Sequence, residues 1–253
     1  KIFFFEIEDW EAEYVEYKIG LPASDLQFTP GKLNGDNLPL DRDAEIISVF
    51  VGSKVSADVI KAFPNLKLIT TRSTGFDHLD LKIAKEKNIK IGYVPGYGDN
   101  TVAEFAFGLI LTLSRKLYEG IDRLRETGQF NYDGLRGFDL MNKTIGIVGT
   151  GRIGKYAVKI AKGFGMNVLA YDAFPNQKLA QELGFRYVLL EELLFNSDVI
   201  TLHVPYLPST HHLIGFQNIS QIKKGAILVN ASRGAVVETE ALVKALKDGI
   251  LAG

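Results

Sequence analysis

The residues from 144 to 172 constrain the fold of this chain more than any other stretch. An apolar run, Ile145 to Val148, leads into the hexapeptide GTGRIG at 149–154, and a segment with helical periodicity follows. A second apolar run then ends at Asp172. This order of strand, glycine-rich turn, helix and strand is that of a dinucleotide-binding βαβ unit. In such a unit Gly149 allows the tight turn, Gly151 lets a pyrophosphate approach the backbone, and Gly154 lets helix and strand pack closely.

The acidic residue at the end of the second strand makes the pattern specific. The phosphates are expected on the N–H groups at the helix N-terminus, which have no partner within the helix. Asp172 follows Gly149 by 23 residues, where a carboxylate binds the adenosine ribose hydroxyls. Because a carboxylate also repels a 2′-phosphate, the sequence favours NAD over NADP. The alternative is a glycine-rich turn in some other α/β protein, which the flanking strands disfavour.

Composition excludes several other classes of function. The chain has 253 residues, enough for one large domain or two modest ones, and its 46% hydrophobic and 23% charged content is ordinary for a soluble globular protein. A net charge of −1 predicts no nucleic acid and no membrane surface as partner. The absence of cysteine excludes disulfides and thiol chemistry, and fits a cytoplasmic location. Adjacent His211 and His212 lack the i, i+4 spacing of a helical metal pair, so no metal site is expected.

Apolar runs alternate with amphipathic segments along the chain, which predicts parallel sheets covered by helices on both faces. In the first part the runs are 2–7, 46–51, 66–70 and 89–94, and the segment 21–40 is expected to be loop with at most one short strand. In the second part, strands are expected at 168–171, 199–203 and 226–230, and helices at 177–183, 189–194 and 238–247.

Residues 95–100 (PGYGDN) break this pattern, so the chain is divided into residues 1–100 and 101–253. Thr101 and Glu104 have the spacing of a capping box and predict a helix from Thr101 to about Lys116. That helix is apolar on almost every side, so we expect it to be buried between layers or subunits. Residues 128–141 are expected to form an arm or connector.

Three segments occupy the carboxyl ends of expected strands, where open α/β sheets bind ligands. In 71–78 (TRSTGFDH) small residues leave backbone N–H groups open to an anion, unless the segment is a simple turn capped by its aspartate. In 202–210 (LHVPYLPST), two prolines fix a loop that would pass beneath a nucleotide, and His203 is either a general base or a structural histidine. In 230–234 (NASRG), Arg233 is either a guanidinium that stabilises charge on a carbonyl oxygen or an exposed loop residue.

Together these motifs resemble those of the D-2-hydroxyacid dehydrogenase family over the whole chain. The resemblance rests on TRSTGFDHLDL (71–81), VPGYGDNTVAE (94–104), NKTIGIVGTGRIG (142–154), SDVITLHVPYLPSTHHLI (197–214) and NASRGAVVETEALVKAL (230–246), in the family's order. The segments FFEIEDWE (4–11) and NYDGLRGFDL (131–140) resemble most the D-lactate dehydrogenase branch. The resemblance implies an α/β protein of two flavodoxin/Rossmann-like, doubly wound parallel-sheet domains with a cleft between them, the first binding substrate and the second NAD.

The resemblance also implies roles for individual residues. Thr74 and Gly75 would hold the substrate carboxylate through backbone N–H groups, and Tyr97 would close over the substrate. Arg233 would be the catalytic residue that binds and polarises the keto acid. The residues expected at the coenzyme site are Gly149, Gly151, Arg152, Ile153, Gly154, Asp172, His203, Val204, Pro205, Thr210, Ala231, Ser232 and Arg233.

The family pattern continues beyond the residues that match Leu251, Ala252 and Gly253. In the family a strand with a nicotinamide-binding aspartate follows, then a glutamate and the histidine that it pairs with, which is the general acid/base. The catalytic glutamate and histidine of the family are absent from this sequence, and none of its four histidines matches the catalytic position. We therefore expect the sequence to belong to a longer protein; a chain that ended there is expected to bind NAD weakly and turn over poorly.

The leading hypothesis is NAD-dependent reduction of a small 2-keto acid, pyruvate to D-lactate, by a homodimer joined through the coenzyme domain. Alternatives within this class are glyoxylate/hydroxypyruvate reductase and phosphoglycerate dehydrogenase. An alternative of a different class is an NAD-binding, corepressor-like interaction protein. A methyltransferase with a similar loop is disfavoured by the strict GxGxxG and by the order of the other motifs.

Overall fold

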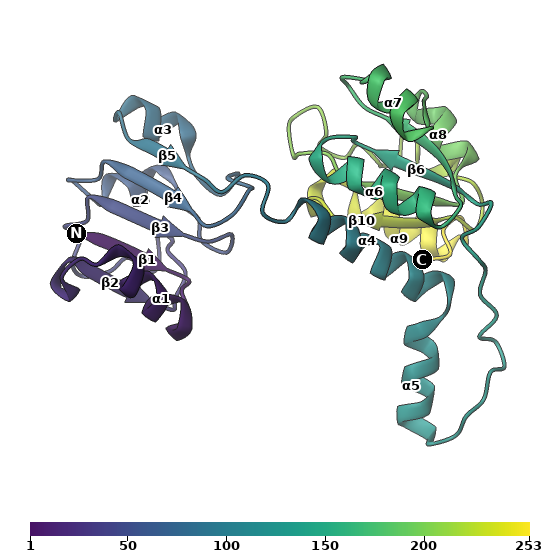
Figure 1. The fold of residues 1–253 in the computed structure, drawn as a ribbon, viewed down its shortest axis with the longest axis horizontal. Helices are drawn as coiled ribbons and strands as arrows, with labels where there is room; N and C mark the ends of the chain where they lie inside the picture. The colour runs from purple at the N-terminus through teal and green to yellow at the C-terminus, as the bar shows by residue number, and fades with distance from the viewer. The chain divides into compact units, whose positions relative to one another are not determined.

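The computed structural model describes residues 1–253, which divide into two compact units, Lys1–Tyr97 and Gly98–Gly253 (Figure 1). We call them unit 1 and unit 2. Each contains one five-stranded sheet, and every pair of neighbouring strands is parallel. The prediction of two doubly wound parallel sheets is therefore confirmed.

Unit 1 has the strand order β2-β1-β3-β4-β5. Its strands are β1 (Ile2–Phe5), β2 (Leu26–Thr29), β3 (Ile46–Val49), β4 (Leu68–Thr71) and β5 (Lys90–Gly92). Its helices are α1 (Asp9–Ile19), α2 (Ala57–Lys61) and α3 (Leu81–Glu86), with a short 3-10 turn, η1 (Ala23–Asp25). The order reverses between β1 and β3, so the ligand crevice of such a sheet lies at the carboxyl ends of these two strands. β2 is the short strand expected within 21–40.

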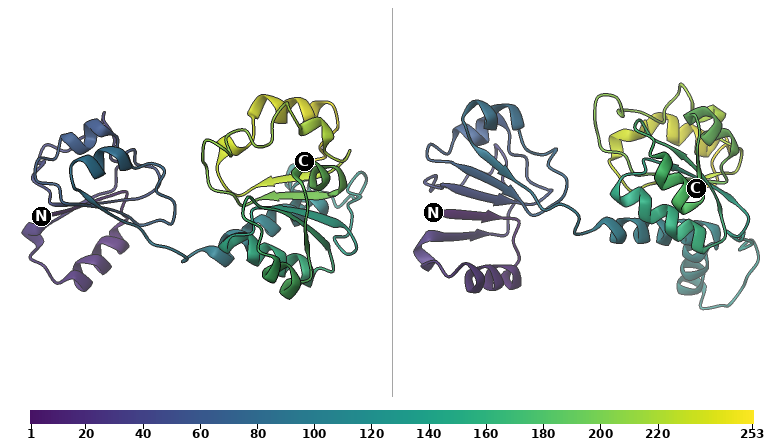
Figure 2. Two further views of the ribbon diagram at one scale, coloured as in Figure 1. Left: turned by 90° about the horizontal axis from the view of Figure 1, so that it is seen from above. Right: turned by 45° about the horizontal axis from the view of Figure 1, so that its top comes forward.

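The core of unit 1 lies on one face of its sheet. Phe3 and Phe5 of β1 and Ile47 of β3 point to this face, because alternate residues of a strand share a side. They pack in one cluster with Val59 and Ile60 of α2. Helix α1, in purple, lies on the other face (Figure 2) and buries none of its own residues. Both faces therefore carry helices, as predicted, but only one forms a tight core.

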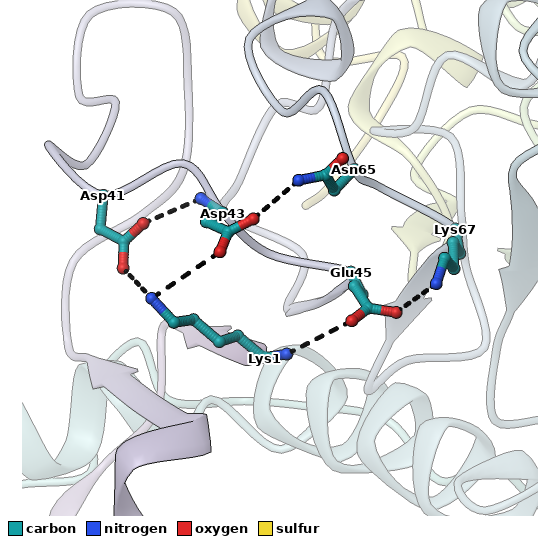
Figure 3. Close-up of polar contacts among 6 residues, drawn as sticks. All are labelled: Lys1, Asp41, Asp43, Glu45, Asn65 and Lys67. Carbon is teal, nitrogen blue, oxygen red and sulfur yellow. Dashed lines mark hydrogen bonds and ion pairs between the residues drawn. The ribbon is translucent and has the colours of Figure 1, made fainter.

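A charged network joins the amino ends of the strands in unit 1 (Figure 3). The Lys1 side chain donates to Asp41 at 2.9 Å, its amino terminus lies 4.0 Å from Glu45 Oε1, and Lys67 pairs with Glu45. The hydrogen bond from Lys67 holds the pKa of Glu45 below its ordinary value. These side chains are exposed and lie at the edge opposite the strand carboxyl ends, so we assign them no part in ligand binding.

Unit 2 has the strand order β10-β9-β6-β7-β8. Its strands are β6 (Thr144–Val148), β7 (Asn167–Tyr171), β8 (Arg186–Tyr187), β9 (Val199–Leu202) and β10 (Ile227–Asn230). Its helices are α4 (Asp99–Ser114), α5 (Leu117–Thr127), α6 (Arg152–Gly163), α7 (Gln177–Leu183), α8 (Leu190–Asn196) and α9 (Thr239–Lys247), with 3-10 turns η2 (Ile219–Gln221) and η3 (Gly234–Val236). Here the order reverses between β6 and β9, which places the ligand crevice at their carboxyl ends.

Helices pack on both faces of the sheet in unit 2 (Figure 1). Phe107 of α4 and Ala157 of α6 join Ile145 of β6 in one core cluster. Leu193 of α8 and Ala241 of α9 belong to a second cluster, on the opposite face. The rigid sheet between them holds the loops at its carboxyl edge in place.

Helix α4 differs from the prediction in its start and in its burial. It begins at Asp99 with Gly98 as N-cap, so Thr101 lies inside the first turn and the predicted capping box is absent. Glu104 instead accepts a hydrogen bond from the Asn100 side chain. An aspartate at the first position stabilises the start of a helix, which explains the earlier beginning. One face of α4 is buried in the core, while Phe105 on another face is 65% exposed, so the helix is not buried on every side within the chain.

The last three residues run beside β10. Leu251 forms a parallel bridge with Ala226, and the N–H of Leu228 donates to the carbonyl of Gly253 at 3.0 Å. No helix of the chain has the length and hydropathy of a membrane span.

Candidate functional site

The turn between β6 and α6 needs glycine at two positions for reasons internal to the chain. Gly149 has φ +93°, and a Cβ there would lie 2.8 Å from the carbonyl oxygen of His203. A Cβ on Gly154 would lie 1.9 Å from the carbonyl oxygen of Gly149. A Cβ on Gly151, in contrast, would meet nothing within 4 Å. The space in front of Gly151 is therefore open, and this fits the close approach of a pyrophosphate to the backbone.

The N-terminus of α6 faces this open space. The helix starts at Arg152 with Gly151 as N-cap, so no side chain caps its first N–H groups. These groups have no acceptor within the helix, and the helix dipole makes this end positive. A cleft of about 550 Å³ opens here, lined among others by Thr150, Arg152 and Lys155. The arrangement fits the predicted anion site, with Ile153 in the first turn of α6.

Asp172 lies at the end of β7, beside the glycine turn. Its Oδ2 accepts hydrogen bonds from the N–H and the hydroxyl of Thr150, at 2.7 and 2.9 Å. Its Oδ1 accepts from the N–H of Phe174 at 2.9 Å. The Thr150 hydroxyl also lies 2.7 Å from the hydroxyl of Tyr187 on β8. Asp172 thus anchors the turn as well as presenting a carboxylate, a second task that sequence reasoning missed.

His203 follows β9, directly beside the glycine turn, and its imidazole is largely buried. Nε2 lies 3.1 Å from the Thr201 hydroxyl, while Nδ1 is buried without a partner. Burial lowers the pKa of His203 to about 4. A general acid or base works best with a pKa near the working pH, so this lowered pKa favours the structural role of His203 over that of a base.

The loop after His203 is closed by its own hydrogen bonds. The Thr210 hydroxyl donates to the carbonyl of Pro205 at 2.6 Å and accepts from the N–H of Leu207 at 2.8 Å. The Val204 side chain lies 3.0 Å from the position of a Cβ on Gly149. Val204 therefore reaches the glycine turn, whereas Thr210 supports the loop from within.

The segment after β10 is shaped by Asn230, which sequence reasoning did not single out. Its Oδ1 accepts from the N–H and hydroxyl of Ser232, at 3.0 and 2.7 Å, and its amide donates to the carbonyl of Arg233 at 2.8 Å. An asparagine followed two residues later by serine is the signal of such a turn. Ala231 packs against the core cluster that holds α4 and α6. Arg233 is exposed with extended backbone, so its guanidinium lies at the carboxyl edge of the sheet.

In unit 1 the loop after β4 is held from behind by hydroxyl groups. Ser73 Oγ donates to the carbonyl of Gly75 at 2.7 Å, and the Thr74 hydroxyl donates to the carbonyl of Val94 at 2.9 Å. No hydrogen bond within the chain uses the N–H groups of Thr74 or Gly75. The following helix, α3, is capped by Asp80 through Ile83 N, so Asp77 is not the N-cap of that helix. Tyr97, the last residue of unit 1, is 59% exposed.

At the carboxyl ends of β1 and β3 in unit 1, two charged side chains bind neighbouring backbone groups. The carboxylate of Glu6, which follows β1 with φ +52°, accepts from the N–H groups of Gly52 and Ser53 at 2.9 and 2.7 Å. Arg72 donates to the carbonyl oxygens of Phe5 and Glu6, at 3.1 and 2.5 Å. Glu6 therefore takes the N–H groups of the turn after β3 that an anion would otherwise use.

The comparisons with known proteins agree with this geometry. Residues 107–253 match the family described as D-isomer specific 2-hydroxyacid dehydrogenase, NAD binding domain. A 2-hydroxyacid dehydrogenase homolog of Zymomonas mobilis is 38% identical and is matched over 100% of this chain and 77% of its own length. A glyoxylate reductase of Korarchaeum cryptofilum is 39% identical over 84% of this chain and 65% of its own length.

The fold of this chain also occurs in solved structures that match it over its whole length. The D-lactate dehydrogenase of Aquifex aeolicus, determined as a complex with NAD and lactic acid, has a TM-score of 0.90 and 37% identity, and covers 100% of this chain. The chain spans 75% of that protein's length.

Proposed function

Because this chain belongs to the D-isomer-specific 2-hydroxyacid dehydrogenase family, whose NAD-binding domain it carries, we propose that it reduces pyruvate to D-lactate with NADH. The coenzyme is NAD, and the chemistry is that of an oxidoreductase acting on a small 2-hydroxy acid. The observation that carries the proposal is the open, positive N-terminus of α6. It lies beside a glycine turn in which Gly149 and Gly154 approach other backbone atoms too closely for a side chain. The relative complexed with NAD and lactic acid supports pyruvate and D-lactate as the pair.

Each site residue then has a defined task. Unit 1, Lys1–Tyr97, is the substrate domain, where the N–H groups of Thr74 and Gly75 bind the substrate carboxylate and Tyr97 closes over the substrate. Bound NADH would supply the hydride to the carbonyl carbon, and the family's histidine, which lies beyond the residues that match Gly253, would supply the proton to the carbonyl oxygen. Arg233 donates hydrogen bonds to the keto acid and stabilises the negative charge that grows on its carbonyl oxygen, as a planar guanidinium does well. The wall of the coenzyme site is formed by Val204 and Pro205, with Ala231 and Ser232 placing Arg233.

Steady-state kinetics with pyruvate, glyoxylate and hydroxypyruvate test the substrate assignment. We expect pyruvate to give the highest kcat/KM, and the product to be the D-enantiomer of lactate. No turnover of pyruvate together with turnover of hydroxypyruvate would refute it, and a preference for glyoxylate would favour the activity named for the Korarchaeum cryptofilum relative. NADH binding without turnover of any of the three acids would favour a binding role, as in corepressors.

A matched pair of arginine variants tests the role of Arg233. Arg233→Gln should lower kcat/KM for the keto acid by about 10²- to 10³-fold, the usual loss when one charge-stabilising donor is removed. Arg186→Gln is the control, because Arg186 is a surface arginine of unit 2 paired with Glu192 at 2.8 Å. Equal effects of the two substitutions would remove Arg233 from the mechanism.

The proposed assembly is a homodimer joined through unit 2. An exposed apolar surface supports it, formed by Leu117, Tyr118, Ile121 and Leu124 of α5 and by Phe130 and Tyr132 of the following segment. Monomeric proteins rarely expose such a surface without a partner. Light scattering on the eluting protein should give twice the chain mass, and Ile121→Asp should reduce it to the chain mass; a monomeric unmodified protein would refute the dimer.

A further inference from the structure

Arg152 carries its charge at an unfavourable place. It is the first residue of α6, and the N-terminus of a helix is the positive end of its dipole. The first turn of α6 contains no acidic residue that would balance it. The Arg152 side chain is 55% exposed, so packing alone does not fix its position. A neighbouring anion is needed to hold this guanidinium at the helix start.

Asp99 is that anion. Its Oδ2 lies 3.4 Å from Nε of Arg152, and its side chain is only 17% exposed. Asp99 is the first residue of α4, where the dipole favours a carboxylate. Both residues line the cleft of about 550 Å³ over the N-terminus of α6. The carboxylate is therefore fixed by a helix that packs in the core and reaches into the coenzyme cleft.

The contact leaves the outer nitrogens of Arg152 available. A guanidinium has five N–H donors in a planar fork, and the ion pair with Asp99 is formed through Nε. No other ion pair or hydrogen bond holds Nη1 or Nη2 of Arg152. We propose that Asp99 is a positioning residue of the NAD site, which holds Arg152 so that Nη1 and Nη2 receive the pyrophosphate of the coenzyme. The proposal rests on NAD binding and does not depend on which keto acid is reduced.

Two opposing effects decide how much Asp99 contributes to the affinity for NADH. The Asp99 carboxylate repels the phosphates, but its charge is balanced by Arg152, so the pair is neutral towards them. Holding the long arginine side chain in place before the coenzyme arrives saves the entropy of ordering it, which corresponds to a factor of about 2 to 10 in Kd. We therefore expect the ordering effect to exceed the repulsion.

A double-mutant cycle on NADH affinity tests the proposal, with Kd measured by NADH fluorescence and by calorimetry at fixed ionic strength. Asp99→Ala should weaken NADH binding by about two- to tenfold, and Arg152→Ala by about tenfold or more. In the Arg152→Ala background, Asp99→Ala should have no further effect, because the group that it positions is gone. Asp99→Glu should restore part of the affinity.

Glu240→Ala provides the matched control, because Glu240 is likewise an acidic residue in the first turn of a helix of unit 2 but lies on the exposed surface of α9. It should leave the NADH affinity unchanged.

Three results would overturn the role of Asp99. Tighter NADH binding by Asp99→Ala would show that Asp99 competes with the coenzyme for Arg152. An equal loss in both backgrounds would show that Asp99 acts through the start of α4 and not through Arg152. Absence of NADH binding by the unmodified full-length protein would overturn the NAD assignment as well, so the two failures are distinguishable.

Discussion

Acidification should destabilise unit 2 through His203, because folding buries this imidazole in its neutral form. Its pKa falls from 6.5 to about 4 on burial. In the unfolded chain the ring binds a proton below pH 6.5, and in the folded chain only near pH 4. The stabilising contribution is therefore complete above the unfolded pKa and is lost as the pH falls towards the folded one.

The magnitude follows from the two pKa values. A tenfold difference in proton affinity between the folded and unfolded chain corresponds to about 1.4 kcal/mol, so the full loss is about 3 kcal/mol. Between about pH 7.5 and about pH 5 the expected loss from this group is about 2 kcal/mol. Such a change is a large part of the stability of an ordinary domain.

Urea denaturation followed by circular dichroism at these two pH values measures the effect, with free energies from linear extrapolation. His203→Gln removes the titrating group, so its loss of free energy between the two pH values should be smaller than that of the unmodified chain by about 2 kcal/mol. His211→Gln, which removes an exposed imidazole in the same unit, should leave the pH dependence unchanged. Equal losses for the unmodified chain and His203→Gln would refute the reasoning.

Three further predictions test other parts of the structure. Gly154→Ala should lower the free energy of unfolding by about 1–3 kcal/mol, because the new Cβ would lie 1.9 Å from a carbonyl oxygen of the same turn; unchanged urea stability would contradict this. Burial raises the pKa of Asp198, but hydrogen bonds from Lys223 and Thr144 outweigh it and hold the pKa below its ordinary value. Asp198→Asn should therefore cost about 1 kcal/mol at neutral pH, and this difference should disappear as the pH falls below the ordinary pKa of the carboxyl; a difference that persists in acid would exclude the charge as its cause. Glu6→Gln should loosen the turn after β3, which Glu6 holds through the N–H groups of Gly52 and Ser53. It should raise KM for the keto acid and leave the Kd for NADH unchanged, since Glu6 lies in unit 1. A matching change in the Kd for NADH would argue against a local effect.

Much of the fold could be predicted because parallel strands buried on both faces leave a clear mark in the sequence. The run before the glycine turn, for example, is almost wholly buried in β6. Helix α7 spans residues 177–183 as predicted, since Asn176 caps it through its side chain and Gly184 ends it in the left-handed conformation.

Three other features of the fold were not predicted from the sequence. β8 is only two residues long and exists because it pairs with β7, a contact that periodicity does not reveal. Helix α5 was also missed, although Leu117, Ile121 and Leu124 have helical spacing, because charged residues dominate this stretch. The start of α4 at Asp99 was missed because Thr101 and Glu104 offered a competing cap.

The candidate functional site likewise has features that the sequence predicts and features that it does not. The roles of Gly149, Gly151 and Gly154 could be predicted from their spacing, because each glycine meets a different steric requirement of the turn. The pairing of Asp99 with Arg152 joins residues 53 positions apart through the packing of α4 on α6, and no spacing rule predicts it. The bonds of Asp172 to Thr150 were likewise hidden, since they depend on how closely β7 approaches the glycine turn.

The most direct test of the account is a titration of the full-length protein that contains this chain with NADH and with NADPH at one ionic strength. The glycine turn, the open N-terminus of α6 and the carboxylate of Asp172 together predict saturable binding of NADH. They also predict that NADPH binds at least about tenfold more weakly, because its 2′-phosphate meets the carboxylate. No saturable binding of NADH, or tighter binding of NADPH than of NADH, would contradict the account.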